Sequence, residues 1–290
     1  MSSPFFWLLL GYVPSGILAL VLGTYQHAAG KRGLRAPVSD KLLRPPGESC
    51  RKKMEELDDK LGNLLLLLMG FPAGVLFYHL SNNGTQTQWV SGTIAGTLGC
   101  IFTLWIVLKM LATLKERDAW RLGFRGERFV GEQINQLMLH GCRVFHDVPL
   151  DGKGNIDHVV VAPSGVFAIE TKAKRKSTAS DTQRAQDVIY DGQCLEFPFY
   201  RGTRDLDQAR VQAERLDKIL NPLLLDPVIV QPILTLPGWF VISRALGDVI
   251  VVNPKMLESA ILSPSHTPLS PDRIREISYI LEQRCRDVEF

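Results

Sequence analysis

Apolar residues are concentrated in the first 115 positions of this chain, and beyond them the pattern becomes periodic. Three apolar stretches without Asp, Glu, Lys or Arg lie in the first part, roughly Phe5–Gly23, Leu61–Leu80 and Trp89–Val107. About 20 such residues can cross a hydrocarbon core of ~30 Å as a helix. We therefore expect residues 1–115 to be an all-α transmembrane region of about three helices, near 5–23, 61–80 and 89–110.

Basic residues indicate the orientation of that region. Nine Lys or Arg lie between positions 31 and 60, none lies between 81 and 88, and several follow the third stretch. Because positively charged loops stay in the cytoplasm, the loop 31–60 and the carboxyl-terminal part should be cytoplasmic, with the amino terminus outside. We expect an integral protein of the cell (inner) membrane, in contact with the lipid bilayer.

From about residue 121 the pattern is that of a soluble α/β domain. Helical periodicity is present over Phe124–His140, Asp205–Leu220 and Pro271–Cys285. Runs of β-branched and aromatic residues predict strands at Arg143–Val148, Val159–Val161, Val166–Ile169, Val228–Leu236, Trp239–Ser243 and Val249–Val252. This order favours a mixed sheet flanked by helices over a doubly wound one. Residues 177–204 are polar and indicate only a turn at Asp191-Gly192.

One predicted hairpin brings charged residues together. If its turn is centred on Pro163-Ser164, paired residue numbers sum to 327, and Asp157 lies opposite Glu170 with Cβ atoms about 5 Å apart. Lys172 follows Glu170 by two residues and projects from the same face. Like charges this close are destabilising unless a cation lies between them. The register therefore predicts a divalent metal site with a lysine beside it.

Other polar residues are candidates for the same metal site. Glu127 shares the buried face of its predicted helix, whereas Glu132 is rotated away from that face. His146 and His158 could bind a metal with Asp157, but a strand histidine is more often a hydrogen-bonded core residue, so zinc is disfavoured. The five cysteines are odd in number and lack CxxC spacing, which excludes a disulfide framework or a zinc cluster.

The chain contains Gly123-x-x-Gly126-Glu127, Phe145-His146-Asp147-Val148, Asn155-Ile156-Asp157-His158 and the run Gly165–Lys172, which reads GVFAIETK. These motifs resemble the nuclease-related domain (NERD) of the PD-(D/E)XK nuclease superfamily, although Ile156 stands where that superfamily has proline. The resemblance covers about residues 121–255 and implies a restriction-endonuclease-like α/β fold. We expect this domain over 116–260 and a helical extension over 261–290.

The resemblance also implies the metal ligands. Asp157 and Glu170, together with the backbone carbonyl of Thr171, would bind the metal. Their hard oxygens suit Mg²⁺ or Mn²⁺. Lys172 would position or activate a water and stabilise the charged phosphate.

Further roles follow from the resemblance. Glu127 matches the glutamate of the first helix and Gln208 the glutamine of the second, although Gln212, one turn later, could also face the sheet. The basic run Lys174, Arg175 and Lys176 could contact nucleic-acid phosphates. Pro237–Phe240 fits a packed turn, but an exposed Trp239 could stack on a base.

The expected function is that of a membrane-anchored, metal-dependent endonuclease that hydrolyses phosphodiester bonds, with DNA favoured and RNA possible. The alternative is a catalytically silent module that binds nucleic acid or protein at the membrane. The net charge of +3 gives no global basic field that favours one of them. The oligomeric state is left open.

Overall fold

The computed structural model describes Thr24 and residues 41–81, 86–152, 154–176, 186–263 and 268–288, with side chains described outside 71–95. The chain divides into two compact units. The first comprises residues 1–39 and 53–119, and the second comprises residues 40–52 and 120–290. The first expected membrane helix, at 5–23, lies outside the described residues.

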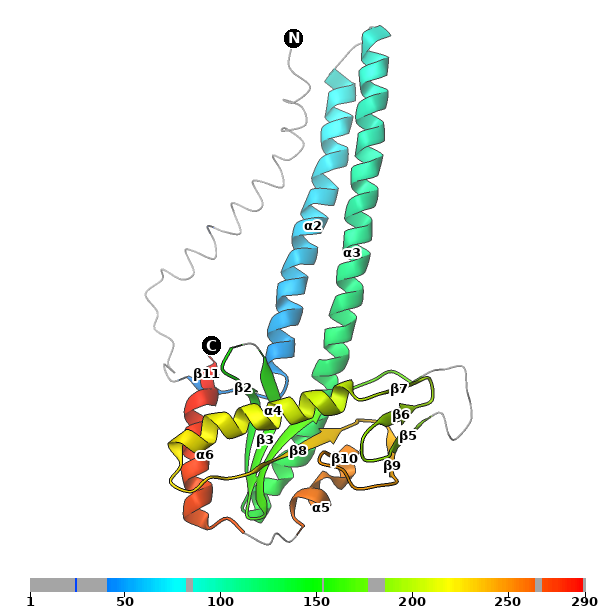
Figure 1. The fold of residues 1–290 in the computed structure, drawn as a ribbon. Helices are drawn as coiled ribbons and strands as arrows, with labels where there is room; N and C mark the ends of the chain where they lie inside the picture. The colour runs from blue at the N-terminus through cyan, green and yellow to red at the C-terminus, as the bar shows by residue number, and fades with distance from the viewer. Residues whose placement is uncertain are drawn as a thin grey trace. The chain divides into compact units, whose positions relative to one another are not determined.

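Two long helices run through the first unit. Helix α2 spans Glu48–Ser81 and helix α3 spans Gln86–Asn135 (Figure 1). α2 thus begins inside the expected loop 31–60, and α3 joins the helices expected at 89–110 and 124–140 into one. The intervening residues 108–122 are mostly Leu, Lys, Arg, Glu and Ala, which favour helix, so nothing there ends α3. Arg117 pairs with Asp58 at 2.5 Å and connects the two helices.

Within the described part of the chain, one helical segment is long and apolar enough to cross a membrane, Gly96–His140. Its apolar side chains are exposed, with Leu98 at 61% and Ile101 and Leu104 at 60%. Exposed leucines at this density are costly in water and suit a lipid environment. A set of three membrane helices remains a prediction.

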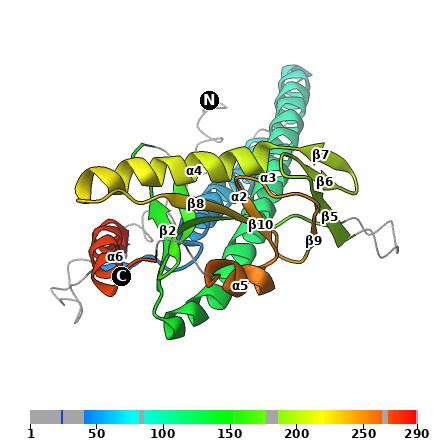
Figure 2. The same ribbon diagram turned by 60° about the horizontal axis from the view of Figure 1, so that its bottom comes forward.

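The second unit is built on a mixed sheet with the strand order β10-β8-β4-β3-β2 (Figure 2). Its strands are β2 (Arg143–Pro149), β3 (Asn155–Ala162), β4 (Gly165–Thr171), β8 (Val230–Thr235) and β10 (Ile250–Val252). β2, β3 and β4 are antiparallel to one another, while β4, β8 and β10 run parallel. The restriction-endonuclease-like mixed sheet flanked by helices is therefore present.

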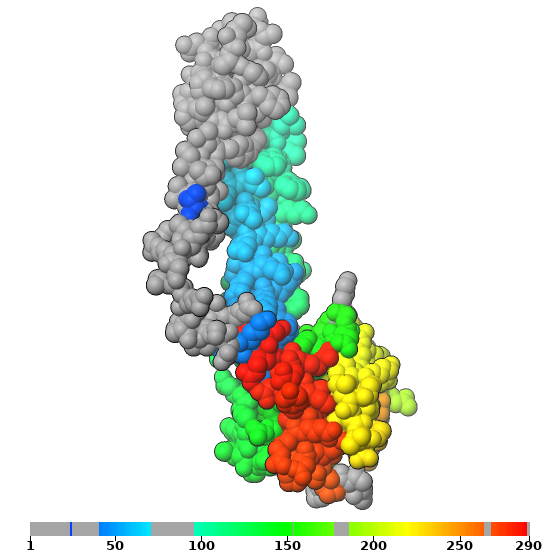
Figure 3. All heavy atoms as spheres, turned by 90° about the vertical axis from the view of Figure 1, so that its left-hand side faces the viewer, coloured from blue at the N-terminus to red at the C-terminus, as the bar shows by residue number. Residues whose placement is uncertain are grey.

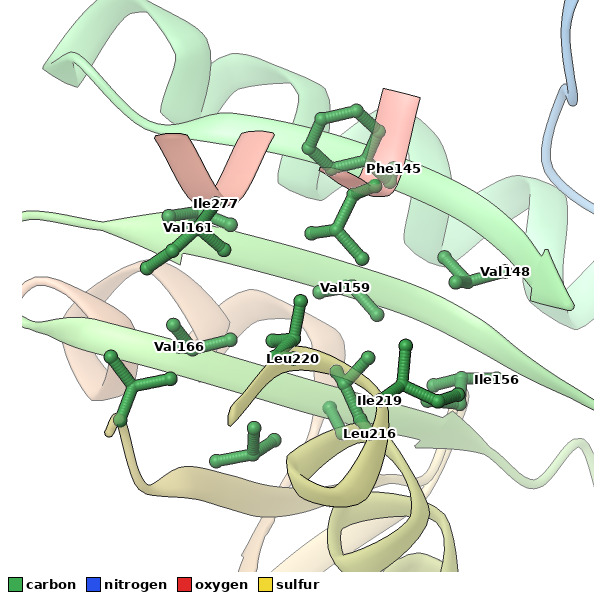
Figure 4. Packing of buried hydrophobic residues seen from close by; sticks show 14 of the residues in the cluster. Phe145, Val148, Ile156, Val159, Val161, Val166, Leu216, Ile219, Leu220 and Ile277 are labelled. Atoms are coloured by element: carbon green, nitrogen blue, oxygen red, sulfur yellow. The ribbon is translucent and has the colours of Figure 1, made fainter. Parts of the chain in front are cut away.

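Alternate residues of the central strands pack on opposite faces of the sheet. Val159, Val161 and Val166 face α4 (Arg204–Leu220) and α6 (Pro271–Cys285) through residues such as Leu216 and Ile277 (Figure 4). On the other face, Val160 and Ile169 pack against α3. This two-sided burial explains the continuous apolar runs of these strands.

The β3–β4 hairpin has the predicted register. Ala162 pairs with Gly165 and His158 with Ile169, so paired numbers sum to 327. Extended by one residue, this register places Asp157 opposite Glu170, where the apolar pairs end. The predicted hairpin register is confirmed between Ala162–Gly165 and His158–Ile169, and the site itself stays a prediction.

A second sheet has the order β7-β6-β5-β9, from β5 (Asp187–Tyr190), β6 (Leu195–Phe197), β7 (Tyr200–Gly202) and β9 (Phe240–Ser243). The sequence predicted no strand at β5, β6 or β7, because these segments of three or four residues are too short to show periodicity. The predicted turn is present: the Asp191 carboxylate accepts hydrogen bonds from the backbone N–H groups of Gln193 and Cys194.

The remaining elements complete the second unit. β1 (Leu42–Leu43) pairs with β11 (Arg286–Val288), and α6 packs into the apolar core, so α6 and β11 belong to the second unit. In Figure 3 the carboxyl-terminal residues, in orange and red, form much of the visible face of this unit beside α4 in yellow. Short helices lie at Gln136–His140, Asn221–Leu223, Pro254–Met256 and Leu257–Ile261. All five cysteines are free.

Candidate functional site

The carboxylates of β3 and β4 meet where the hairpin leaves the apolar core. Asp157 is 8% exposed, and its Oδ2 accepts a hydrogen bond from the backbone N–H of Thr171 at 2.7 Å. Glu170 is 1% exposed and forms an ion pair with Lys172, which follows the strand end. The hairpin thus places two buried carboxylates and one lysine together.

Helix α3 contributes a third buried carboxylate. Glu127 is 7% exposed, and the Cys50 thiol donates a hydrogen bond to its Oε1 at an Sγ–Oε1 distance of 3.1 Å. Glu132 is exposed and lies 3.9 Å from Arg128 on the outer side of the helix. The structure therefore favours Glu127 over Glu132 as the glutamate of the site.

A glycine lets α3 approach the end of β4. A Cβ atom on Gly126 would lie 2.6 Å from Cβ of Ala173, closer than real side chains come. The residue next to the candidate glutamate must therefore lack a side chain. This accounts for one glycine of the Gly123-x-x-Gly126-Glu127 motif.

Burial raises the pKa of all three carboxyl groups, and charges of neighbouring carboxylates add to it. Burial is the main cause for Glu127, and it raises that pKa from 4.5 to about 7 despite the opposing hydrogen bond from Cys50. Burial, followed by the charges of Glu170 and Glu127, raises the pKa of Asp157. Burial also raises the pKa of Glu170, although Lys172 opposes it. Three carboxyl groups thus share the site with one lysine, and burial penalises their charged forms.

Lys172 stays protonated in this environment. Burial alone lowers its pKa, but attraction to Glu170 and Asp157 outweighs burial and holds the pKa above its usual value. The ammonium group can therefore act as a fixed positive charge at neutral pH.

The donor atoms fit a divalent metal. Glu127 Oε2 and Glu170 Oε2 are buried and have no hydrogen-bond partner among the described residues. Unpaired buried carboxylate oxygens are costly, and hard cations such as Mg²⁺ and Mn²⁺ bind them. As the described side chains lie, no three His, Cys, Asp or Glu residues already form a metal cluster. Glu170 instead pairs with Lys172, and Glu127 with Cys50.

The two candidate glutamines differ in placement. Gln208 is exposed and lines a hollow next to Lys172. Gln212 is buried, donates to the backbone carbonyl of Asn155 at 3.0 Å, and contributes to lowering the pKa of Glu170. Gln212 thus lies beside Glu170, and Gln208 lies on the side of Lys172, so the role of either glutamine stays a prediction. The sequence indicates this placement, because Gln212 lies three residues after Ala209 and four before Leu216, which are both on the buried face of α4.

Two of the three residues in the basic run 174–176 already have polar partners. Lys174 pairs with Asp205 at 2.6 Å, and Lys176 donates to Gln186 at 2.9 Å, while Arg175 is exposed. Trp239 is 4% exposed, and its indole N–H donates to the Lys174 carbonyl at 3.3 Å. Trp239 is thus a core residue and offers no face for a base.

The two strand histidines form a buried pair. Nδ1 of His146 lies 2.9 Å from Nδ1 of His158, and Nε2 of His146 lies 3.0 Å from Asn135 Oδ1. Burial lowers the pKa of His146 to about 4 and lowers that of His158 as well. Both rings are neutral and hydrogen-bond to each other as core residues, while Nε2 of His158 is buried without a partner among the described residues.

Asp147 was not recognised as a site residue from the sequence. It is fully buried, with φ of 50°, and accepts hydrogen bonds from Arg44, Ser49 and Asn155. The β2–β3 register places it opposite Asp157. Its partners from residues 44 and 49 lie about 100 positions upstream, and no local pattern reveals them.

A mixed sheet flanked by helices, with buried acidic residues and a lysine at one end, fits a restriction-endonuclease-like domain. Residues 122–237 match the family model of the nuclease-related domain, NERD, and this segment is a nuclease-related domain, as its motifs indicated. Searches of curated proteins and of solved structures found no match. Residues 40–52, which supply Arg44 and Cys50, lie outside the matched segment but inside the same compact unit.

Proposed function

We propose that this protein is a membrane-anchored, divalent-metal-dependent nuclease that hydrolyses phosphodiester bonds of nucleic acid, DNA first of all. The observation that carries this proposal is the convergence of Glu127, Asp157 and Glu170 beside Lys172 in a nuclease-related domain. Buried carboxylates with raised pKa values and one charged lysine are common features of sites that move protons or bind cations.

Asp157, Glu170 and the Thr171 carbonyl would hold the metal, Mg²⁺ or Mn²⁺. Such an ion lowers the pKa of a bound water and neutralises charge on a phosphate. Lys172 supplies a positive charge where charge develops on the phosphate. Glu127, with a pKa of about 7, can accept or return a proton near neutral pH. Gln212 fixes Glu170 from α4.

The anchoring part of the proposal rests on α3. Its segment Gly96–His140 combines length and apolarity with exposed leucines. The excess of Lys and Arg in 31–60 supports a nuclease-related domain on the cytoplasmic side of the cell membrane. A carboxyl-terminal tag that a protease reaches in inverted vesicles but not in intact cells would support this; the opposite result would contradict it.

Cleavage is tested with the full chain in detergent. Supercoiled and linear duplex DNA, single-stranded DNA and RNA are incubated with Mg²⁺ or Mn²⁺. Asp157→Asn and Lys172→Met should lose activity by ~100-fold or more, because each removes an interaction with developing charge. Glu132→Gln is the matched control, since this exposed glutamate lies on the same helix, and it should keep full activity.

Calorimetry with each metal separates the outcomes. A folded protein that neither binds Mg²⁺ or Mn²⁺ nor cleaves any substrate would refute the proposal. Nucleic-acid binding that persists in Asp157→Asn, with no cleavage by the unmodified chain, would instead establish a silent tethering module.

A further inference from the structure

A hollow of about 300 Å³ adjoins the candidate active site. It is lined by Lys172, Lys174, Tyr200, Gly202, Arg204, Asp205 and Gln208. Because Lys172 belongs to both, anything bound in the hollow lies next to the reacting phosphate. Its wall comes from β7 and from the start of α4, which β7 leads into (Figure 2).

The lining of the hollow favours an anion. It contains the cations Lys172, Lys174 and Arg204 and one carboxylate, Asp205, while Lys172 also pairs with Glu170 outside the lining. Asp205 pairs with Lys174, while the Arg204 side chain is exposed. A guanidinium group suits a phosphate because its planar fork can bind two oxygens at once.

One side of the hollow carries an aromatic ring on a rigid support. Tyr200 stacks on Phe197 with ring centroids 4.6 Å apart and planes at 10°, and Phe197 meets Trp239 edge-on at 5.2 Å. Tyr200 is nevertheless 46% exposed, and the neighbouring Phe199 is 65% exposed. Lys174 Nζ lies 4.8 Å from the centroid of the Tyr200 ring, so the ammonium group and the ring are neighbours in the hollow.

Exposed aromatic rings combined with cations bind unpaired nucleotides. Bases stack on the rings, and the cations follow the backbone. A duplex offers its phosphates equally well, but its neighbouring base pairs cover the base faces. The aromatic ring therefore distinguishes single-stranded from double-stranded nucleic acid.

We propose that this hollow binds an unpaired nucleotide of the substrate strand beside the scissile phosphate. Its base stacks on Tyr200, and its phosphate is held by Lys174 and Arg204. The inference rests on the proposed nuclease function and narrows the substrate to nucleic acid with a single-stranded segment at the cleavage position.

The stacking contact is tested by fluorescence anisotropy with the full, metal-free chain in detergent, where no cleavage occurs. The probes are a labelled single-stranded DNA and a duplex of the same sequence. Tyr200→Ala should weaken single-strand binding about tenfold and leave duplex binding within about twofold, since stacking contributes ~1–3 kcal/mol per base. Tyr200→Trp should retain binding, and Tyr279→Ala, at another exposed tyrosine, should change neither probe.

The phosphate contact has its own readout. Arg204→Ala should weaken single-strand binding and lower the slope of log K against log salt by about 1. Arg275→Ala, at an exposed arginine of α6, should leave the slope unchanged.

The results separate this inference from the nuclease proposal. If single-strand binding depends on Tyr200 but the unmodified chain cleaves nothing, the hollow binds nucleotides as proposed and the nuclease proposal is refuted. The nucleotide-binding role of the hollow is refuted if the unmodified chain cleaves nucleic acid and Tyr200→Ala binds both probes as before. It is also refuted if Tyr200→Ala loses affinity for both probes equally. Near-ultraviolet circular dichroism of each variant confirms that the fold is retained.

Discussion

The carboxyl groups of Glu127, Asp157 and Glu170 lie in surroundings that penalise their charged forms. Burial is the main cause of the raised pKa in each case, and the charges of Glu170 and Glu127 add to it at Asp157. A site arranged in this way costs stability as long as no cation occupies it. Binding of a cation would stabilise the folded protein, because the same carboxylates would then serve as ligands.

This cost predicts a pH effect for Glu127. Its folded pKa of about 7 lies above the ordinary 4.5, so its contribution to stability is present below about pH 4.5 and lost as the pH rises through about 7. Glu127→Gln cannot ionise, so it avoids the loss of stability at high pH. It should stabilise the metal-free protein at pH 8 by roughly 1–3 kcal/mol, with little gain at pH 4. Chemical unfolding in detergent at both pH values measures it. Equal effects at pH 4 and pH 8 would contradict the assignment, and Glu132→Gln should show no effect.

Cys50 is expected to act through Glu127. Its thiol is the hydrogen-bond donor to Oε1, and its loss leaves a buried acceptor unpaired at a cost of ~1–3 kcal/mol. Cys50→Ala should therefore lower kcat about tenfold with KM little changed, and Cys50→Ser, which keeps a donor, should recover most of it. Cys142→Ala, at a cysteine equally buried, serves as control. An equal loss of kcat in Cys50→Ala and Cys50→Ser would show that the substitutions affect only packing.

At this scale, local spacing revealed some residues and not others. Asp157, Glu170 and Lys172 follow from the hairpin register, because a tight turn fixes which residues are opposite. Cys50 is 77 residues from Glu127, and a contact of that separation leaves no pattern along the chain. The apolar stripe of α4 indicates Gln212, and the family resemblance pointed instead to Gln208, one turn away.

Among the elements, α3 connects the apolar segment with the candidate site in one helix. Its apolar part and its amphipathic part were expected as separate helices, since their patterns differ. Backbone continuity depends on helix propensity between them, which is high throughout 108–122. The strands β5, β6 and β7 were missed for the opposite reason, since their pairing with one another and with β9 defines them more than their composition does.

The close approach of α3 to the end of β4 gives a prediction for Gly126. Alanine there would gain up to ~1 kcal/mol of helix propensity, but its Cβ would meet Ala173 at 2.6 Å and force the helix away. Gly126→Ala should destabilise the protein by ~1–3 kcal/mol and reduce cleavage, as Glu127 shifts with the helix. Urea unfolding and kcat measure the two effects.

Gly123 is the matched control, one turn earlier on α3. A Cβ atom there would lie 3.6 Å from Cys50 Sγ, an ordinary contact. Gly123→Ala should be neutral or slightly stabilising. Equal loss in the two variants would show that helix flexibility, and not the approach to Ala173, requires these glycines.

For the whole molecule, the boundary of the matched domain differs from the boundary of the compact unit. Arg44 donates hydrogen bonds to Asp147 and Asp287, at 2.9 Å and 2.7 Å, and β1 pairs with β11. Residues 40–52 thus fold with a domain whose main part begins at residue 120. The mixed sheet could be predicted because its strands carry their own pattern, whereas this upstream segment is held by single polar contacts.

Removal of the Arg44 side chain should therefore be costly. Asp147 is fully buried, and loss of a buried ion partner typically costs ~3–5 kcal/mol. We expect Arg44→Ala to lower the free energy of unfolding by about 3 kcal/mol. Arg201→Ala, which breaks the exposed pair with Asp191, should cost less than about 1 kcal/mol. Similar small values for both would show that Asn155 and Ser49 satisfy Asp147 without Arg44.

The pairing of β1 with β11 also has a consequence for synthesis on the ribosome. Arg44 is made 243 residues before its partner Asp287, so that contact forms only after nearly the whole domain has been translated. Until then Arg44 and Ser49 can reach Asp147, but β1 has no neighbouring strand, and the segment that carries Cys50 is held by fewer contacts. A nascent chain that stalls before residue 286 contains every motif of the nuclease-related domain and still lacks the contacts that close it.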